Sequence, residues 1–154
     1  MSSHTEREAG LSGPPQPPGE LAARTLAMPA DTNPNGDMFG GWIMSLMDAA
    51  GAITATSRAG GRVVTAAVSN IAFLQPVKVG DVVCCYTDIR KIGRSSITLD
   101  VEVWVLRQGC GERIKVTAAE FTYVALDDSG RPRQVGGSEN AAATAAEVPQ
   151  PADL

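Results

Sequence analysis

The sequence predicts an α+β fold in which a curved antiparallel sheet wraps around one long central helix. Three observations carry this prediction. Apolar residues recur at three- and four-residue steps through one long segment, from Gly40 to about Arg58, which indicates a largely buried helix. Four segments rich in Val, Ile and Thr follow it. One of them, residues 97–105, alternates apolar with mostly polar residues, as expected for a sheet with one covered face.

The elements are expected in a simple order along the chain. Residues 21–28 form a short first strand that Pro29 ends, and a turn-rich loop with Asn-Pro and Asn-Gly pairs leads into the helix. Because the connections between the later strands are short, each strand is expected to lie antiparallel beside the one before it. Only the helix can cover the apolar face of such a sheet. These four later strands are expected at residues 62–74, 82–92, 95–106 and 112–126.

Both ends of the chain lack the residues that build a core. Residues 1–20 are rich in Pro and residues 136–154 in Ala, so both are expected to be disordered tails. The ordered part is then one domain, residues 21–135. Small residues at 49–52 would let a neighbouring backbone approach the helix closely. Its buried apolar positions are expected at Ile43, Leu46, Met47, Ala50 and Ile53.

Composition and charge exclude several classes of function. The net charge is −4, and no run of Lys or Arg could follow a phosphate backbone, so no nucleic-acid partner is expected. No stretch has the length of a signal peptide core or of a membrane-spanning helix, so no membrane association is expected. Of the three cysteines, Cys84 and Cys85 must face opposite sides of a strand and Cys110 lies in a turn. A disulfide framework is therefore not expected, and a reducing, cytoplasmic location is.

Several residue patterns are absent from the sequence, and their absence excludes further classes of catalytic site. The single histidine, His4, falls in the first predicted tail, which excludes Ser-His and Cys-His nucleophiles and histidine metal sites from the folded domain. The chain also has no nucleophile elbow, phosphate loop or dinucleotide fingerprint. We therefore expect no metal and no cofactor. Any catalysis must use carboxylates, hydroxyls, amides and backbone N–H groups.

Asp48 stands out among the remaining groups, because an unpaired carboxylate in the middle of a buried helix costs several kcal/mol. From the residues alone, a structural bond to a sheet hydroxyl or a subunit neighbour and a catalytic role are equally good explanations. Asp37 is the rival carboxylate, but capping of the helix that follows would explain it. Gly40 and Gly41 would expose N–H groups at the positive end of the helix, which suits an oxyanion site or simply relieves packing.

The spacing of these groups has a geometric consequence. Gly41 and Asp48 are seven residues apart, so they lie about 10 Å apart along the helix axis. One reacting carbonyl cannot contact both groups in the same chain. If two such helices pack antiparallel about a twofold axis, however, the glycine end of one chain approaches Asp48 of the other. Two equivalent sites would then form between two copies.

The segment from Asn33 to Gly41, Asn-Pro-Asn-Gly-Asp-Met-Phe-Gly-Gly, followed by Met47-Asp48, resembles the hotdog-fold acyl-CoA thioesterases of the YciA type. The resemblance extends over residues 21–132 and includes several further blocks in the right order. It implies a hotdog fold and the hydrolysis of acyl-CoA to a free acid and CoA. It also implies a homodimer assembled further into a trimer of dimers, a hexamer. The further blocks are residues 24–29, 40–44, 62–65, 79–86 and 93–96.

The same resemblance implies roles for individual residues. Asp48 matches the catalytic carboxylate of the family, and Asn33 matches a loop amide contributed by the opposite subunit. Gly40 or Gly41 matches the backbone that binds the thioester oxygen, and Thr65 matches a hydroxyl near the attacking water. Some relatives carry His directly before the glycine pair, where this chain has Phe39. The oxyanion must therefore rely on backbone donors here.

The hairpin at residues 90–96 is the candidate for binding CoA. Arg90, Arg94, Ser95 and Ser96 offer cations and hydroxyls suited to phosphate, and a solvated turn is the plain alternative. Arg94 and Ser95 are preferred because the resemblance includes them. Two other functions fit the fold: a non-catalytic acyl-CoA-binding protein, and a hydratase or dehydratase, which would need a catalytic histidine. Asp48 could act either as a general base or as a nucleophile.

Overall fold

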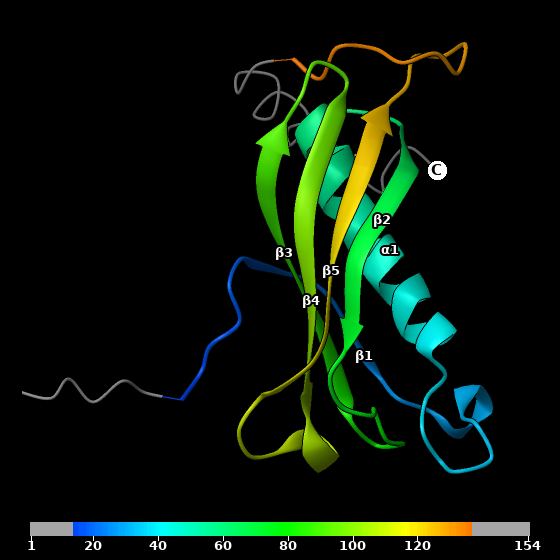
Figure 1. The fold of residues 1–154 in the computed structure, drawn as a ribbon, viewed down its shortest axis with the longest axis vertical. Coiled ribbons are helices and arrows are strands. Elements are labelled where there is room, and N and C mark those ends of the chain that lie inside the picture. Colours follow the sequence, from blue (N-terminus) through cyan, green and yellow to red (C-terminus); the bar gives the residue numbers. More distant parts are fainter. Residues whose placement is uncertain (1–13, 137–154) are drawn as a thin grey trace, which may run out of the picture.

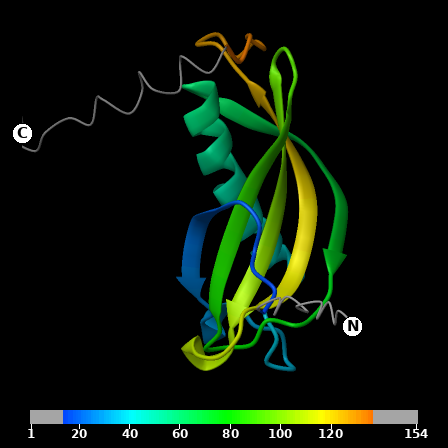
Figure 2. The same cartoon turned by 90° about the vertical axis from the view of Figure 1, so that its left-hand side faces the viewer.

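The computed structural model describes residues 14–136. Five strands form one open antiparallel sheet, and one long helix packs against its concave face (Figures 1 and 2). This arrangement confirms the predicted α+β class. The elements are β1 (Glu20–Leu26), η1 (Pro29–Asp31), α1 (Gly40–Ala59), β2 (Val63–Phe73), β3 (Val82–Ile92), β4 (Ser96–Leu106), η2 (Arg107–Gly109) and β5 (Ile114–Ala125).

Helix α1 presents one apolar face to the sheet and ends at a glycine. Gly60 adopts a left-handed conformation with φ of 68°, and its N–H donates to the Thr56 carbonyl, which is a common helix ending. The predicted helix is thus confirmed, and so is the burial of most of its expected positions. Ile53 is the exception, because 57% of it is exposed. The sheet covers only the face that carries Ile43, Met47 and Ala50, so the expected burial of Ile53 is wrong for a single chain.

The order of strands in the sheet is β1-β3-β4-β5-β2. Strands β3, β4 and β5 form the expected meander, but β2 pairs with β5 and not with β3, which corrects the prediction. Residues 74–81 connect β2 to β3 across the end of the sheet, where the Leu74 N–H donates to the Val116 carbonyl. An extended connection of this length spans about 25 Å. Crossing three strand spacings needs only about 14 Å.

The core lies between α1 and the concave face of the sheet. Strand β4 contributes five fully buried side chains, Ile97, Leu99, Val101, Val103 and Val105, which confirms the expected alternation. Strand β2, at one edge, is different: nearly all of its residues are exposed, although several are apolar. Cys84 and Cys85 are both buried, Cys110 is exposed, and all three are free.

The chain continues past β5 and returns over the end of the helix. Arg133 donates through Nη2 to the Ala59 carbonyl at 2.9 Å, and Arg58 donates to the Gly136 carbonyl at 3.3 Å. Residues 1–13 and 137–154, which make up most of the two predicted tails and include His4, lie outside the described residues. Within residues 14–136, no helix is long and apolar enough to cross a membrane.

Candidate active site

Asp48 lies in the middle of α1, where its carboxylate meets two hydroxyl groups from the sheet. Thr65 on β2 donates from Oγ1 to Asp48 Oδ1 at 2.7 Å, and the Tyr123 hydroxyl on β5 lies 3.0 Å from the same oxygen. No described residue donates to Oδ2. The carboxylate is half-buried, so it is more open in the single chain than the sequence suggested. One oxygen is therefore fixed by hydrogen bonds, and the other can accept a proton or contact a carbonyl carbon.

Tyr123 was not predicted from the sequence as a residue of the site. Its ring is fully buried, and its hydroxyl also lies 2.8 Å from the backbone carbonyl of Asp48. The hydroxyl reaches Asp48 only because residue 51 is glycine: a Cβ there would lie 2.4 Å from the Tyr123 hydroxyl oxygen. Gly51, one of the small residues at 49–52, thus admits a side chain in this chain, whereas the sequence led us to expect the approach of a neighbouring backbone. The sequence does contain a signal for this residue: Tyr123 falls on the apolar face of its strand, and a buried tyrosine hydroxyl needs a hydrogen-bond partner.

The environment of Tyr123 keeps its hydroxyl protonated. Burial raises the pKa of Tyr123 well above its usual range, and the neighbouring negative charge of Asp48 raises this pKa further. A protonated phenol remains a hydrogen-bond donor at any physiological pH. Tyr123 therefore holds the Asp48 carboxylate in one orientation.

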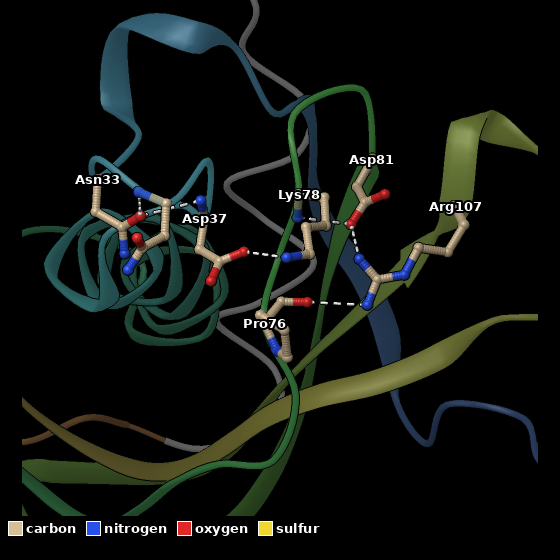
Figure 3. A network of polar contacts seen from close by, with 7 residues as sticks. Asn33, Asp37, Pro76, Lys78, Asp81 and Arg107 are labelled. Atoms are coloured by element: carbon tan, nitrogen blue, oxygen red, sulfur yellow. Dashed lines mark hydrogen bonds and ion pairs between the residues drawn. The ribbon is translucent and has the colours of Figure 1, made fainter.

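The loop before α1 places Asn33 in a defined orientation (Figure 3). Asn33 Oδ1 accepts hydrogen bonds from the N–H groups of Asn35 at 2.9 Å and Asp37 at 3.1 Å. The Asn33 N–H in turn donates to the Asp37 carbonyl at 2.7 Å. Because the amide oxygen is occupied inside the loop, the Nδ2 group is the part of this side chain left to donate to a ligand.

The start of the helix offers backbone donors, as predicted. Phe39 is the N-cap and no side chain caps the helix, so the N–H groups of Gly40 and Gly41 donate to no acceptor among the described residues. The expected capping role of Asp37 is wrong. Its carboxylate instead forms an ion pair with Lys78, which lies beside it in the β2–β3 connection. A cation at contact distance outweighs the partial charge of a helix end.

These two groups of residues do not meet within one chain. Asn33 and Gly40 line a cavity of about 350 Å³ at the tip of the helix, together with Ile43 and Phe73. Asp48 lies two helical turns further along and does not line this cavity. The chain thus carries two half-sites, one with the carboxylate and one with the oxyanion donors.

The hairpin between β3 and β4 carries the predicted CoA-binding residues, but the structure separates Arg90 from the others. The Arg90 guanidinium contacts Asp100 at 2.9 Å and Asp88 at 3.5 Å, and it lines a cavity with further carboxylates. Those acids disfavour a phosphate there. Arg94 is exposed at the hairpin tip and has no acidic partner within residues 14–136. Ser95 and Ser96 lie beside Arg94 in the sequence and are half-buried.

Comparisons with known proteins agree with this geometry. Residues 35–112 match the model of the thioesterase superfamily. The chain is 58% identical to the acyl-CoA thioester hydrolase YciA of Salmonella typhimurium over 120 residues, which are 76% of this chain and 90% of the relative. It is also similar to a hexameric broad-specificity acyl-coenzyme A thioesterase, solved as a variant with alanine in place of an aspartate. That structure has a TM-score of 0.77 and 56% identity, over 79% of this chain and 90% of the other.

Two further solved structures extend the comparison. A hexameric hotdog-fold thioesterase of Campylobacter jejuni has a TM-score of 0.73 and 40% identity, over 82% of this chain and 97% of the other. An acyl-CoA hydrolase from Staphylococcus aureus has a TM-score of 0.70 and 35% identity, over 75% of this chain and 70% of the other. Its variants with alanine in place of an aspartate, an asparagine or a threonine have also been solved. The chain has the hotdog fold and belongs to the thioesterase superfamily, within the YciA family of acyl-CoA thioester hydrolases.

Proposed function

We infer that this protein is an acyl-CoA thioesterase that releases a free fatty acid and CoA, and that Asp48 is the carboxylate on which the reaction depends. The observation that carries the assignment of Asp48 is its geometry: Thr65 and Tyr123 fix Oδ1, and no residue between 14 and 136 donates to Oδ2. The three residues replaced in the Staphylococcus aureus hydrolase are separated by the same intervals as Asn33, Asp48 and Thr65. This agreement in residue type and spacing supports the proposal.

The complete site requires a second copy of the chain. The carboxylate half-site and the helix-tip half-site are separate in one chain, and β2 beside Asp48 is an unpaired, largely exposed edge. Pairing of two β2 edges would bring α1 of one subunit against α1 of the other. The hexameric relatives support an assembly of this kind. We propose a dimer with two shared sites, assembled as a trimer of dimers.

Each active site uses residues from both subunits. The thioester oxygen binds to the N–H groups of Gly40 and Gly41 of one subunit, with Asn33 Nδ2 as a further donor. Asp48 of the partner subunit faces the carbonyl carbon with its Oδ2 atom. Either Oδ2 removes a proton from a water held by Thr65 and Asn33, or Oδ2 attacks the carbon and water then opens the anhydride. In both routes the C–S bond breaks and the CoA sulfur is released as a thiol.

CoA itself is recognised at the β3–β4 hairpin. Arg94, Ser95 and Ser96 offer a cation and hydroxyls for phosphate, whereas Arg90 contributes less because Asp100 already neutralises it. The reaction needs no cofactor, since water is the second reactant and CoA is part of the substrate. A cytoplasmic location, away from membranes and nucleic acid, is proposed as well. The free cysteines of the described residues support a reducing compartment.

The role of Asp48 is tested by replacing it with asparagine. Asp48→Asn keeps the shape of the side chain but removes the base, so kcat is expected to fall by about 10²- to 10⁴-fold. Asp128→Asn is the matched control, because it makes the same change in an exposed turn after β5. Activity is measured by thiol release from acyl-CoA, and CoA binding by calorimetry. Equal kcat in Asp48→Asn and the control would disprove the assignment and favour a non-catalytic binding protein.

A single turnover in ¹⁸O-labelled water separates the two routes. Label incorporated into Asp48 indicates the anhydride route, because water that attacks the Asp48 Cγ atom of the anhydride leaves its oxygen in the side chain. Label found only in the product acid shows that water attacked the acyl carbon, and the absence of an anhydride that hydroxylamine can trap then indicates direct attack with Asp48 as the base. Mass spectrometry of the peptide containing Asp48 measures the difference.

A further inference from the structure

A chain of polar contacts links the loop that carries Asn33 to the 76–81 turn and the start of β3 (Figure 3). Its far end is Asp81, whose side chain is fully buried at the start of β3. Asp81 Oδ2 accepts hydrogen bonds from Arg107 Nη1 at 2.6 Å and from the Lys78 N–H at 2.9 Å. Arg107 also donates through Nη2 to the Pro76 carbonyl at 2.9 Å. Arg107 therefore holds both ends of the 76–81 turn.

The turn is joined to the Asn33 loop by its backbone and by an ion pair. Asp37 and Lys78 form an isolated antiparallel bridge, and the Met38 N–H donates to the Val77 carbonyl at 2.8 Å. Lys78 Nζ forms an ion pair with the Asp37 carboxylate, as Figure 3 shows. The backbone of the same Asp37 exchanges hydrogen bonds with Asn33, through Asn33 Oδ1 and the Asn33 N–H. Asp37 therefore connects the 76–81 turn to the Asn33 side-chain amide.

The Lys78–Asp37 ion pair matters more for the reaction than for folding. The side chains of Lys78 and Asp37 are 50% and 28% exposed, and exposed ion pairs contribute little to stability. Asp37 also does not cap the helix. What the pair restrains is a loop whose backbone sets the direction of the Asn33 amide. Displacements of about 1 Å in such groups are known to lower rates strongly.

We propose that Lys78 is a positioning residue for the reaction: it holds Asp37, and through Asp37 it fixes the Asn33 amide that donates to the thioester oxygen. This inference rests on the proposed function of Asn33. Lys78 does not itself reach the reacting atoms. Arg107 and Asp81 act one step further away, since they keep the 76–81 turn in the shape that presents Lys78.

The proposal is tested first by removing the charge of Lys78. In Lys78→Met we expect kcat to fall about tenfold because the amide is misdirected, while KM for acyl-CoA changes little. Lys115→Met is the matched control: Lys115 forms a similar, partly exposed ion pair with Glu102 on the outer face of the sheet. It is expected to retain the kcat of the unaltered protein. The exchanged pair, Asp37→Lys with Lys78→Asp, is expected to recover part of the lost kcat.

A double-mutant cycle with Asn33 separates positioning from general damage. If Lys78 acts through Asn33, Lys78→Met lowers kcat in the unaltered protein but has no further effect in Asn33→Ala. An equal loss of kcat in both backgrounds, or an unchanged kcat in Lys78→Met alone, overturns the inference while the role of Asn33 stands. An unchanged kcat in Asn33→Ala overturns the role of Asn33 and the inference with it. The two failures therefore give different patterns.

Discussion

Strands β2 and β4 have the same length and are both rich in β-branched residues, but they have opposite surroundings. Strand β4 has a neighbour on each side, and its apolar face is covered by α1, so every second side chain is fully buried. Strand β2 has only β5 beside it. Val64, Val68 and Phe73 are 45%, 38% and 50% exposed.

This difference shows that the strand sequence of β2 is suited to an environment that one chain does not provide. An edge strand with exposed valines, left in water, is a site for pairing with another strand. The apolar residues of β2 are explained if a second copy covers them, and the same contact completes the proposed site. Strand β4 thus stabilises the fold of one subunit, whereas β2 is suited to the contact of the proposed dimer.

The largest expected effect comes from a charge on β2. Val68→Asp is expected to separate the proposed dimer and to lower kcat by about 10²-fold or more, because the oxyanion donors of the proposed site come from the other subunit. Light scattering measures the mass and a thiol-release assay the activity. Leu21→Asp, on the opposite edge strand β1, is the control and should keep the mass of the unaltered assembly. An active dimer in Val68→Asp would remove the proposed role of β2.

The matching change on β4 is expected to damage folding instead. Leu99→Ala leaves a cavity in the core and should lower the free energy of unfolding by about 2–5 kcal/mol. Val68→Ala, on the exposed strand, should lower it by less than about 1 kcal/mol at the same protein concentration. Urea denaturation measures both. Comparable losses would mean that the two strands are not as different as their exposure indicates.

Tyr123 lies between the two strands, paired with Thr65 of β2 and with Ile97 of β4. Tyr123→Phe removes the hydroxyl that contacts Asp48 and is expected to lower the free energy of unfolding by about 1 kcal/mol. It should also lower kcat, because only Thr65 then orients the carboxylate. Tyr86→Phe, on a half-buried tyrosine of β3, is the control for loss of a hydroxyl. An unchanged kcat in Tyr123→Phe would show that Thr65 alone orients Asp48.

The sequence predicted the helix, the strands and the buried face of β4, because these depend on local patterns of apolar residues. It did not predict the pairing of β2 with β5, which depends on the path of residues 74–81 across the sheet. In the candidate site, Asp48 was recognisable as an acid in an apolar helix. Tyr123 and Lys78 were not, because each meets its partner only through contacts between distant parts of the chain.

The last expected effect concerns how the free energy of unfolding responds to alkaline pH through Cys85, a buried thiol on β3. Burial, and then the charge of Cys84, raises the pKa of Cys85 to about 12, whereas an unfolded thiol titrates near its ordinary value of about 8.5. Between these pH values the unfolded state binds fewer protons than the folded state. The free energy of unfolding should therefore fall as pH rises, by up to about 1.4 kcal/mol per pH unit.

Cys85→Ala should reduce this slope between pH 9 and 10, and the contribution of Tyr123, whose pKa is also raised, should be the same in every variant. Cys110→Ala, which removes an exposed thiol, should leave it unchanged. Urea denaturation at closely spaced pH values measures the slope for both variants. If the slope is the same in Cys85→Ala as in the unaltered protein, then the thiol that faces Val103 of β4 is more accessible than its complete burial implies. The contrast between the covered strands and the open edge at β2 would then be weaker than the structure indicates.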